Sequence, residues 1–458
     1  MELEALIRRA EGKTLEFKRD ASSSGPILKT VCAFANAAGG TLLIGIEDRS
    51  GTVLGVSDPL DTEERLASII ADGISPRLVP SIELLPWRET RVLAVNVYPG
   101  PSRPYSVTSG SGTAAAYVRV GSTNRIADDA LMAEMGRSAR NISYDESPLP
   151  ELAESDIDLA ALGEALGGMR RIGAADLRTL RLTVDDQGRR VPTVGAILLF
   201  GRRRLETFPD AWIQAGRFKG TDKRTVIDSA DFRDYPIAAV EQVLAFITRN
   251  TSMSYEIHGP RRLDVPEYPS VAVREAVINA VAHADYSQQG APIRVAIFDD
   301  RLEITSPGLL VAGLTIADVL SGVSKLRNRV IGRVLREANL IEQWGSGIQR
   351  MRAACEAAGL PEPLLEEIGT SFRVTMFSAR EREAHPTNPL DERTLDALRS
   401  ADGLGTSDVA EAIGRTARAT RTRLQRLVEA GLVVEIGSGP NDPQRRYYIA
   451  EDPGRYGN

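Results

Sequence analysis

The sequence predicts an α+β multidomain protein, and three observations lead to that prediction. The chain has 458 residues, against a usual domain size of roughly 150. Apolar residues make up 42% of it and charged residues 26%, the balance of a globular chain. Two charged, proline-bearing stretches, residues 144–158 and 380–392, are typical of linkers. The predicted modules are residues 1–143, residues 144–384 with the first linker at their start, and residues 385–458.

Composition and charge exclude several classes of protein. The longest apolar runs are far shorter than the roughly 20 residues of a membrane helix, and the N-terminal residues lack the apolar core of a secretory signal. Two distant cysteines, Cys32 and Cys355, predict two buried thiols in a reducing cytoplasm rather than a disulfide. Only three histidines are present, which argues against a multi-histidine metal site. The net charge of −6 still allows a local basic face.

The first module alternates helix and strand patterns. Apolar residues at helical spacing predict a helix over residues 27–37, which a pair of glycines ends. An apolar β-type run predicts a strand at residues 41–47. Further strands are expected at residues 91–97 and 116–120. This combination indicates an α+β domain.

Three motif groups of this module match a known family. They are EGKTLEFK from Glu11, FANAAGG from Phe34 together with GIED from Gly45, and YVRVGS from Tyr117. The set resembles the divergent AlbA-type domain shared by Schlafen proteins and many bacterial regulators, over about residues 5–135. The resemblance implies an AlbA-type α+β domain that binds nucleic acid.

The resemblance also places an acidic triad in this module. In Schlafen ribonucleases, the triad falls on the positions of Glu11, Glu16 and Asp48. Carboxylates gathered at one point bind Mg²⁺ or Mn²⁺, and such a cation stabilises a phosphoryl transition state or activates water. Lys18 could hold a phosphate beside them. The alternative is that Glu11 and Glu16 pair with nearby lysines or arginines and organise a binding fold without cleavage.

The second module shows both strand and helix patterns. Apolar β-type runs predict strands, and a period near 3.6 residues predicts helices. The strands are expected at residues 193–200, 293–298 and 302–305, and the helices at residues 236–249, 270–284 and 325–338. No P-loop motif occurs in the chain, so a P-loop helicase is not expected.

The predicted helix at residues 270–284 carries Glu275, Asn279 and His283 at a spacing of four. These side chains therefore share one helix face. A carboxylate and an amide so spaced suit water activation and Mg²⁺ ligation beside a triphosphate. The string resembles the N-box of the gyrase, Hsp90, histidine-kinase and MutL ATPase superfamily, in the diverged form attached to AlbA-type regulators.

Three later motifs match the same subgroup, over about residues 185–378. They are DRLEITSPG from Asp300, SKLRN from Ser324 and EQWGSGIQR from Glu342. The resemblance implies an α/β-sandwich ATPase-like domain that binds ATP, with Asn279 as a metal ligand. The implied nucleotide-binding residues are Glu275, Asn279, His283, Ser306, Gly308, Gly345 and Gly347.

Two departures from the superfamily limit this prediction. The adenine-reading aspartate has no counterpart near Ser306 and Gly308, and Ala282 lies where a second acidic residue is usual. Weak or absent ATP hydrolysis follows from these departures. The alternative is a degenerate fold used for dimer contacts or for sensing a ligand.

Residues 390–450 predict a winged helix-turn-helix. Three helices are expected at residues 391–398, 406–413 and 416–429, followed by a hairpin of residues 433–436 and 446–449. Thr406 or Ser407 is the expected N-cap of the second helix, and Gly414 ends it.

The third helix of this module is rich in arginine and has no acidic residue between its arginines. Arginine on a helix that enters a major groove contacts phosphates or a guanine edge. The candidate DNA contacts, two of them on the wing, are Arg415, Arg418, Arg421, Arg423, Arg445 and Arg446. The alternative is a solvated arginine face or a protein-contact helix.

These patterns together predict a cytoplasmic, nucleotide- or ligand-responsive DNA-binding transcriptional regulator that acts as a homodimer. Its expected partners are DNA and, as a further candidate, RNA, without membrane contact. The implied cofactors are Mg²⁺ or Mn²⁺ and ATP. The alternative function is a metal-dependent nuclease, nucleotide-gated and defensive. A third is an interaction scaffold with inactive sites.

Overall fold

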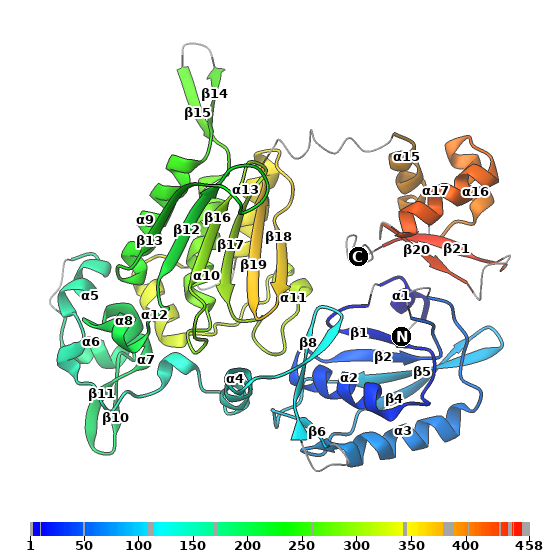
Figure 1. The fold of residues 1–458 in the computed structure, drawn as a ribbon, viewed down its shortest axis with the longest axis horizontal. Helices are drawn as coiled ribbons and strands as arrows, with labels where there is room; N and C mark the ends of the chain where they lie inside the picture. Colours follow the sequence, from blue (N-terminus) through cyan, green and yellow to red (C-terminus); the bar gives the residue numbers. More distant parts are fainter. Residues whose placement is uncertain are drawn as a thin grey trace. The chain divides into compact units, whose positions relative to one another are not determined.

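The computed structural model describes most of the chain and divides it into two compact units. The first unit is Met1–Gly136 with Pro386–Asn458, and the second is Arg137–His385 (Figure 1). The described residues are 3–9, 11–48, 51–108, 114–168, 172–258, 261–341, 346–378, 389–401, 403–429, 432–437, 442 and 444–450. The predicted linker at residues 380–392 lies largely outside them. Of the helices within these ranges, none has the length and apolar character that a bilayer crossing requires.

A four-stranded sheet forms the centre of the first unit. Its strands are β1 (Leu15–Lys18), β2 (Gly40–Ile44), β5 (Thr90–Val97) and β4 (Ser81–Trp87), in that spatial order. Only the β1–β2 pair is parallel. Helices α2 (Ser24–Asn36) and α3 (Pro59–Gly73) cover one face of the sheet (Figure 1). Their apolar side chains pack against that face.

Smaller elements complete this part of the unit. They are α1 (Leu3–Ile7), β3 (Ile74–Ser75), β6 (Ser106–Thr108), β7 (Ala114–Ala115), β8 (Tyr117–Val120), β9 (Thr123–Ile126) and α4 (Asp129–Ala139), which ends in the second unit. The helix and strands predicted here from apolar spacing are confirmed as α2, β2, β5 and β8. Gly39 has a φ of 81°, which lets the chain turn from α2 into β2.

The C-terminal module has the predicted order of three helices and a hairpin. Its elements are α15 (Pro389–Arg399), α16 (Thr406–Ile413), α17 (Ala417–Glu429), β20 (Val433–Ile436) and β21 (Arg446–Ile449). One detail differs: the N-cap of α16 is Gly405, not Thr406 or Ser407, and its N–H donates to the Asp408 carboxylate at 2.9 Å. Gly414 ends this helix in the left-handed conformation, as predicted.

The hairpin β20–β21 explains why this module belongs to the first unit. Val434, Ile436 and Tyr448 share an apolar cluster with α1 and with the sheet face opposite α2. Arg88 Nη1 also lies 3.0 Å from the buried Asp442 carboxylate. The wing therefore packs on protein within this unit.

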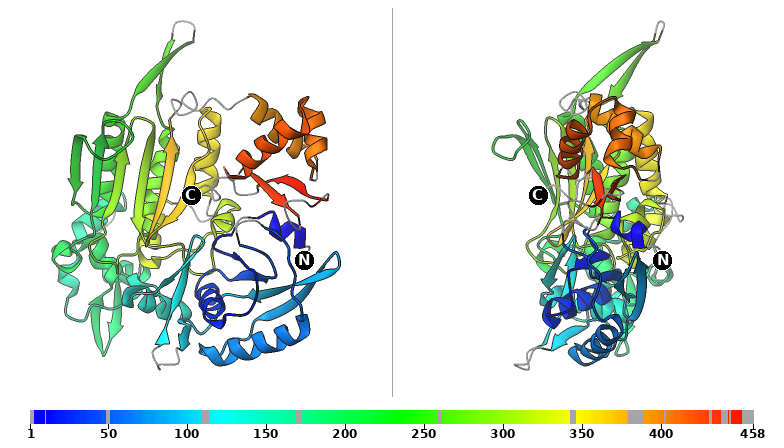
Figure 2. Two further views of the ribbon diagram at one scale, coloured as in Figure 1. Left: turned by 45° about the vertical axis from the view of Figure 1, so that its right-hand side comes forward. Right: turned by 90° about the vertical axis from the view of Figure 1, so that its right-hand side faces the viewer.

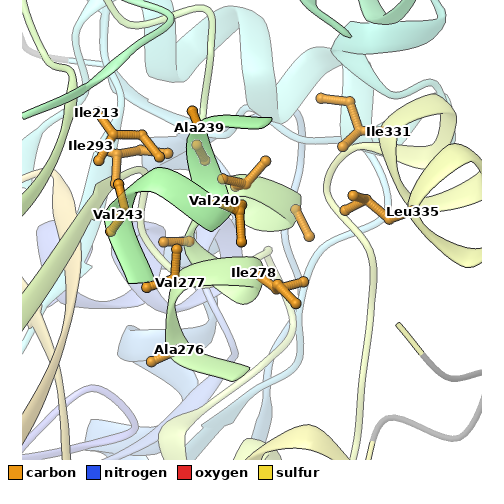
Figure 3. Packing of buried hydrophobic residues seen from close by; sticks show 14 of the residues in the cluster. Ile213, Ala239, Val240, Val243, Ala276, Val277, Ile278, Ile293, Ile331 and Leu335 are labelled. Atoms are coloured by element: carbon orange, nitrogen blue, oxygen red, sulfur yellow. The ribbon is translucent and has the colours of Figure 1, made fainter. Parts of the chain in front are cut away.

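A six-stranded sheet dominates the second unit. In spatial order, its strands are β13 (Val226–Phe232), β12 (Ile213–Phe218), β16 (Ile293–Ile297), β17 (Arg301–Pro307), β19 (Ser371–Phe377) and β18 (Leu364–Ile368). Among the helices that pack into its core are α9 (Pro236–Asn250), α10 (Ser270–His283), α12 (Arg329–Glu337) and α13 (Gly347–Ala357). Figure 3 shows aliphatic side chains of the sheet, α9, α10 and α12 meeting in this core.

The remaining elements lie around this sheet. They are η1 (Tyr144–Glu146), η2 (Glu154–Asp156), α5 (Leu159–Ala165), α6 (Ala174–Thr179), β10 (Thr183–Asp186), β11 (Arg189–Pro192), α7 (Val194–Phe200), α8 (Arg204–Thr207), β14 (Met253–His258), β15 (Arg261–Pro266) and α11 (Ile316–Leu320). The β14–β15 hairpin projects from the second unit in every view (Figure 2).

Two element predictions for this unit are wrong. The strand predicted at residues 193–200 is helix α7 in the structure. Every residue of this helix is buried, so its sequence is a continuous apolar run. A run of this length has no period that distinguishes a helix from a strand. Its N-cap, Thr193, accepts a hydrogen bond from the Ala196 N–H at 3.2 Å. The helix predicted from residue 325 begins only at Arg329.

The predicted linker at residues 144–158 is also wrong, because this stretch packs into the second unit. Asp145 is fully buried, and Ile157 belongs to the core. The Asp145 carboxylate accepts hydrogen bonds from the Arg329 and Ile331 N–H groups at 3.0 and 2.9 Å and from the Ser143 hydroxyl at 2.7 Å. It therefore caps the first turn of α12 from a distant part of the chain.

We expect Asp145→Ala to destabilise the second unit by about 2 kcal/mol, because the N–H groups of α12 would then be buried without partners. The measurement is urea denaturation of the full chain, with hydrogen exchange of α12 as the local readout. Asp156→Ala is the control, because that carboxylate accepts its 2.8 Å bond from Ala153 N–H at an exposed 3₁₀ turn. Equal effects of the two variants would contradict the capping role.

Candidate nucleic-acid and ligand sites

The arginine-bearing face of α17 is exposed. Leu424 and Leu427 point into the core of the C-terminal module, which turns the opposite face of the helix outward. Arg415, Arg418 and Arg421 are exposed, and their guanidinium groups form no hydrogen bond or ion pair with any described residue. Three cations thus remain available to an anionic partner.

The other three predicted DNA contacts are engaged within the module. Arg423 pairs with Asp391 of α15, which Arg426 Nη2 also contacts at 2.5 Å. Arg445 Nη1 lies 3.1 Å from the Glu435 carboxylate on β20. These pairs hold α17 to α15 and close the wing hairpin.

Arg446 is exposed but also has a partner within the module. Its Nη1 donates to the Gly403 carbonyl at 2.9 Å. The structure therefore divides the predicted set into an exposed group on α17, which we call the α17 arginine face (Arg415, Arg418 and Arg421), and a group with internal partners. Sequence reasoning could not separate the groups, because the partners lie on other elements.

The structure brings the acidic triad of the first module together around a lysine. Lys18 Nζ lies 2.6 Å from Glu16 Oε1 and 3.5 Å from Asp48 Oδ2. The other oxygen of Glu16 pairs with the buried guanidinium of Arg119. Glu11 accepts a 2.7 Å hydrogen bond from Phe17 N–H.

Two cationic side chains, Lys18 and Arg119, lie among the three carboxylates of this cluster. Burial raises the pKa of Glu11, and the neighbouring carboxylates Glu16 and Asp48 raise it further. The hydrogen bond from Phe17 N–H lowers this pKa but does not cancel the rise. Burial alone would lower the pKa of Lys18, but the hydrogen bond and charge of Glu16 raise it, so the ammonium stays protonated.

This arrangement does not fit a bound Mg²⁺ or Mn²⁺. Lys18 occupies the point between the carboxylates, and both oxygens of Glu16 already have cationic partners. Among the described residues, no group of three acidic, cysteine or histidine side chains is placed to ligate a metal. The geometry agrees with the alternative in which the glutamates organise the fold.

A cavity of about 170 Å³ lies in the second unit beside α10. Most of its wall is apolar, from β17, β19, α11 and the loops that precede α12. The polar or glycine residues that line it, among those described, are Glu275, Asn279, His283, Ser306, Gly308, Ser324, Lys325, Arg327, Arg336, Ser346, Gly347 and Arg350. Six of the seven predicted nucleotide-binding residues therefore meet at one cavity, and the seventh, Gly345, lies outside the described residues.

The Glu275 carboxylate lies beside the N-terminal end of α13. Its carboxylate is 7% exposed, and Oε2 accepts a hydrogen bond from Arg350 Nη2 at 3.0 Å. A Cβ on Gly347 would lie only 2.0 Å from Glu275 Oε1, so a side chain at this position would displace the Glu275 carboxylate. The glycine predicted to approach a phosphate instead makes room for a carboxylate of the protein.

Asn279 and His283 line the cavity without a hydrogen-bond partner among the described residues. Ser306 lies on β17, and Gly308 follows it with a φ of 103° in close contact with Asp285 and Arg327. Among the described lining residues, only Asn279 offers a side-chain amide oxygen, a group that could ligate Mg²⁺ beside a bound triphosphate.

Sequence reasoning missed the cationic residues of the cavity. Lys325, Arg327, Arg336 and Arg350 line it together with a single carboxylate, that of Glu275, in the described part of its wall. Three of them lie in motifs that match the ATPase-like family, so basic residues inside those motifs were the available signal.

Burial of His283 makes the stability of the second unit depend on pH. Burial lowers its pKa from 6.5 to about 4, so the ring is neutral at pH 7. The pKa of His283 is lower in the folded protein than in the unfolded chain. The free energy of unfolding is therefore not reduced by this histidine above pH 6.5, and it falls as the pH is lowered toward 4. We expect wild type to lose about 3 kcal/mol more stability than His283→Gln between pH 7 and pH 4. Denaturation of both proteins at each pH measures the difference, and parallel curves would contradict it.

Comparisons with known families agree with this architecture. The model described as "Schlafen, AlbA_2" matches residues 11–128, and "Winged helix-turn-helix DNA-binding" matches residues 387–434. The model described as "Putative ATP-dependent DNA helicase recG C-terminal" matches residues 290–376. The predicted AlbA-type, ATPase-like and winged-helix modules are therefore confirmed.

Two solved structures resemble the chain. A protein from Corynebacterium diphtheriae is 22% identical, with a TM-score of 0.44, over 98% of this chain and 96% of that one. The N-terminal domain of a RecG-related protein from Nitrosomonas europaea is 31% identical, with a TM-score of 0.22, over 27% of this chain and 88% of that one. A comparison with curated proteins finds no match.

Proposed function

We propose that this chain, which joins an AlbA_2 domain, a recG-C-terminal-type module and a winged helix-turn-helix, is a ligand-responsive DNA-binding transcriptional regulator. One observation carries the proposal. The α17 arginine face presents three exposed guanidinium groups on the helix that a winged helix-turn-helix inserts into a major groove. Arginine there neutralises phosphates and reads guanine edges.

The cavity of the second unit supports the ligand-responsive part of the proposal. Its cationic side chains favour an anionic ligand, and its apolar wall suits a ring. We propose a nucleotide such as ATP as that ligand, with Asn279 as the candidate Mg²⁺ contact. Titration of the full chain with a fluorescent ATP analogue tests this, and no binding at millimolar Mg²⁺-nucleotide would refute it.

We further propose that the protein acts as a homodimer in the cytoplasm. Winged-helix regulators read two half-sites with a two-fold symmetric dimer, so a pseudo-palindromic target is expected. The two free, buried cysteines, Cys32 and Cys355, are compatible with a reducing compartment.

Selection from a pool of random duplexes tests the function as a whole. The full chain is incubated with the pool, bound duplexes are amplified and sequenced, and the rounds are repeated with and without nucleotide. We expect a discrete, pseudo-palindromic motif whose recovery changes with nucleotide. A final pool as random as the starting pool would contradict a regulator.

The metal-dependent nuclease remains the second candidate, because Glu11, Glu16 and Asp48 do lie close together in the first unit. The ammonium of Lys18 among them opposes metal binding. Incubation of the full chain with single-stranded and transfer RNA plus Mn²⁺ distinguishes the candidates. Cleavage that Asp48→Asn abolishes would support the nuclease, and intact RNA would support binding without cleavage.

A further inference from the structure

The ion pair between Glu275 and Arg350 gives the cavity a property that the ATPase resemblance does not imply. In the ATPase superfamily that the chain resembles, a glutamate at this position is expected to activate water. A general base needs a lone pair directed at the water it deprotonates. Here Glu275 Oε2 is bound to Arg350 Nη2 at 3.0 Å, and Oε1 lies against Gly347 at the start of α13. Oε2 is therefore engaged by a cation and not by a water.

The surroundings of the pair are those of an anion site. Lys325, Arg327 and Arg336 also line the cavity, so its cationic side chains outnumber the one carboxylate in the described wall. Arg350 is 36% exposed, whereas the Glu275 carboxylate is 7% exposed. An incoming anion therefore reaches the guanidinium without first removing the carboxylate from a sealed core.

The positions of the two side chains are fixed by their helices. Glu275 projects from α10, whose opposite face is packed in the core. Arg350 lies one turn into α13, and Gly347 provides the space in which the carboxylate sits. A phosphate forms the same kind of charge-assisted hydrogen bond to a guanidinium as a carboxylate does.

We propose that Arg350 is the anion-binding residue of the cavity, that Glu275 occupies it as an internal counter-ion, and that a phosphate-bearing ligand competes with Glu275 there without being hydrolysed. This inference rests on the proposal that the cavity receives a nucleotide-type ligand. It makes Glu275 a positioning residue that lowers ligand affinity, and not a catalytic one.

The consequences of the competition have opposite signs for the two partners. Removal of the Glu275 charge removes the internal competitor for Arg350 and strengthens ligand binding. Removal of the Arg350 charge weakens ligand binding. When both charges are removed, loss of Glu275 no longer strengthens binding, because there is no guanidinium for which it could compete. A helix-stabilising role alone would weaken binding in both cases.

The experiment titrates the full chain and its variants with a fluorescent ATP analogue and displaces the analogue with inorganic tripolyphosphate. We expect Glu275→Gln to tighten binding of both probes by about tenfold and Arg350→Met to weaken it by about tenfold, as one charge-assisted contact allows. The double variant should bind like Arg350→Met. Arg350→Lys retains the charge and should lie close to wild type.

Arg352→Met is the matched control. Arg352 lies on the same helix and its Nε contacts Glu362 at 2.5 Å, away from the cavity lining. We expect its loss to leave both affinities unchanged. Release of inorganic phosphate from ATP should be absent in wild type and in Glu275→Gln.

Three results would overturn the inference. The first is unchanged or weaker binding by Glu275→Gln. The second is ATP hydrolysis by wild type that Glu275→Gln abolishes at unchanged affinity, which would make Glu275 a base. The third is no binding of either probe by any variant, which would also remove the nucleotide ligand from the proposed function. Duplex binding through the α17 arginine face is measured separately, and its outcome does not depend on these ligand-binding results.

Discussion

Replacing Arg418 and Arg421 together by alanine should weaken duplex DNA binding by about 100-fold near physiological salt. Both guanidinium groups belong to the α17 arginine face and have no partner among the described residues, so their loss leaves the module's internal contacts intact. Each arginine at a phosphate or guanine contributes about 1–3 kcal/mol. Fluorescence anisotropy of a labelled duplex gives the affinity.

The same titrations at several salt concentrations add a second readout. Loss of two phosphate contacts should reduce the salt slope by about 1.8. Arg399→Ala is the control, because Arg399 is an exposed arginine of α15 that pairs with Asp396 at 2.7 Å. If the control weakens binding as much as the double variant, the module binds by bulk charge and not through α17.

Replacing Glu16 by alanine should destabilise the first unit by about 3–5 kcal/mol, because it leaves the Arg119 charge buried without its carboxylate. Arg119 is 1% exposed and its Nε also donates to the Gly12 carbonyl at 2.9 Å, so it cannot turn to solvent without losing that hydrogen bond. Thermal unfolding and urea denaturation of the full chain measure the loss.

Asp48→Asn is the control for that experiment, because the Asp48 side chain is 52% exposed and contacts Lys18 only at 3.5 Å. We expect it to change stability by less than about 1 kcal/mol. Glu16→Ala is also the obvious test for a nuclease, so a loss of RNA cleavage in that variant has to be compared with its folding. Equal stability of Glu16→Ala and wild type would contradict the structural role.

Local signals predicted the C-terminal module well. The helix period, the glycine that ends α16 and the alternation of the hairpin are all properties of neighbouring residues, and they gave α16, β20 and β21 with their observed bounds. Three cavity residues were also predicted from spacing, because an interval of four places Glu275, Asn279 and His283 on one face of α10. The other three, Ser306, Gly308 and Gly347, came from the motifs that resemble the ATPase superfamily.

Several failures involve contacts that only the folded chain creates. The stretch containing Asp145 has the composition of a linker, but the carboxylate caps α12, whose N–H groups lie more than 180 residues away. Arg423 reads as a DNA contact until Asp391 is seen beside it. Glu16 reads as a metal ligand until Lys18 and Arg119 are seen to take both of its oxygens. Charge pairing of this kind depends on tertiary structure.

Arginine-selective labelling with and without duplex DNA tests the central claim most directly. The full chain is treated with a dicarbonyl reagent, and the modified arginines are located by mass spectrometry. The account predicts that duplex protects Arg415, Arg418 and Arg421, while Arg399 reacts equally in both samples. Undiminished labelling of the α17 arginine face in a saturated DNA complex would contradict it.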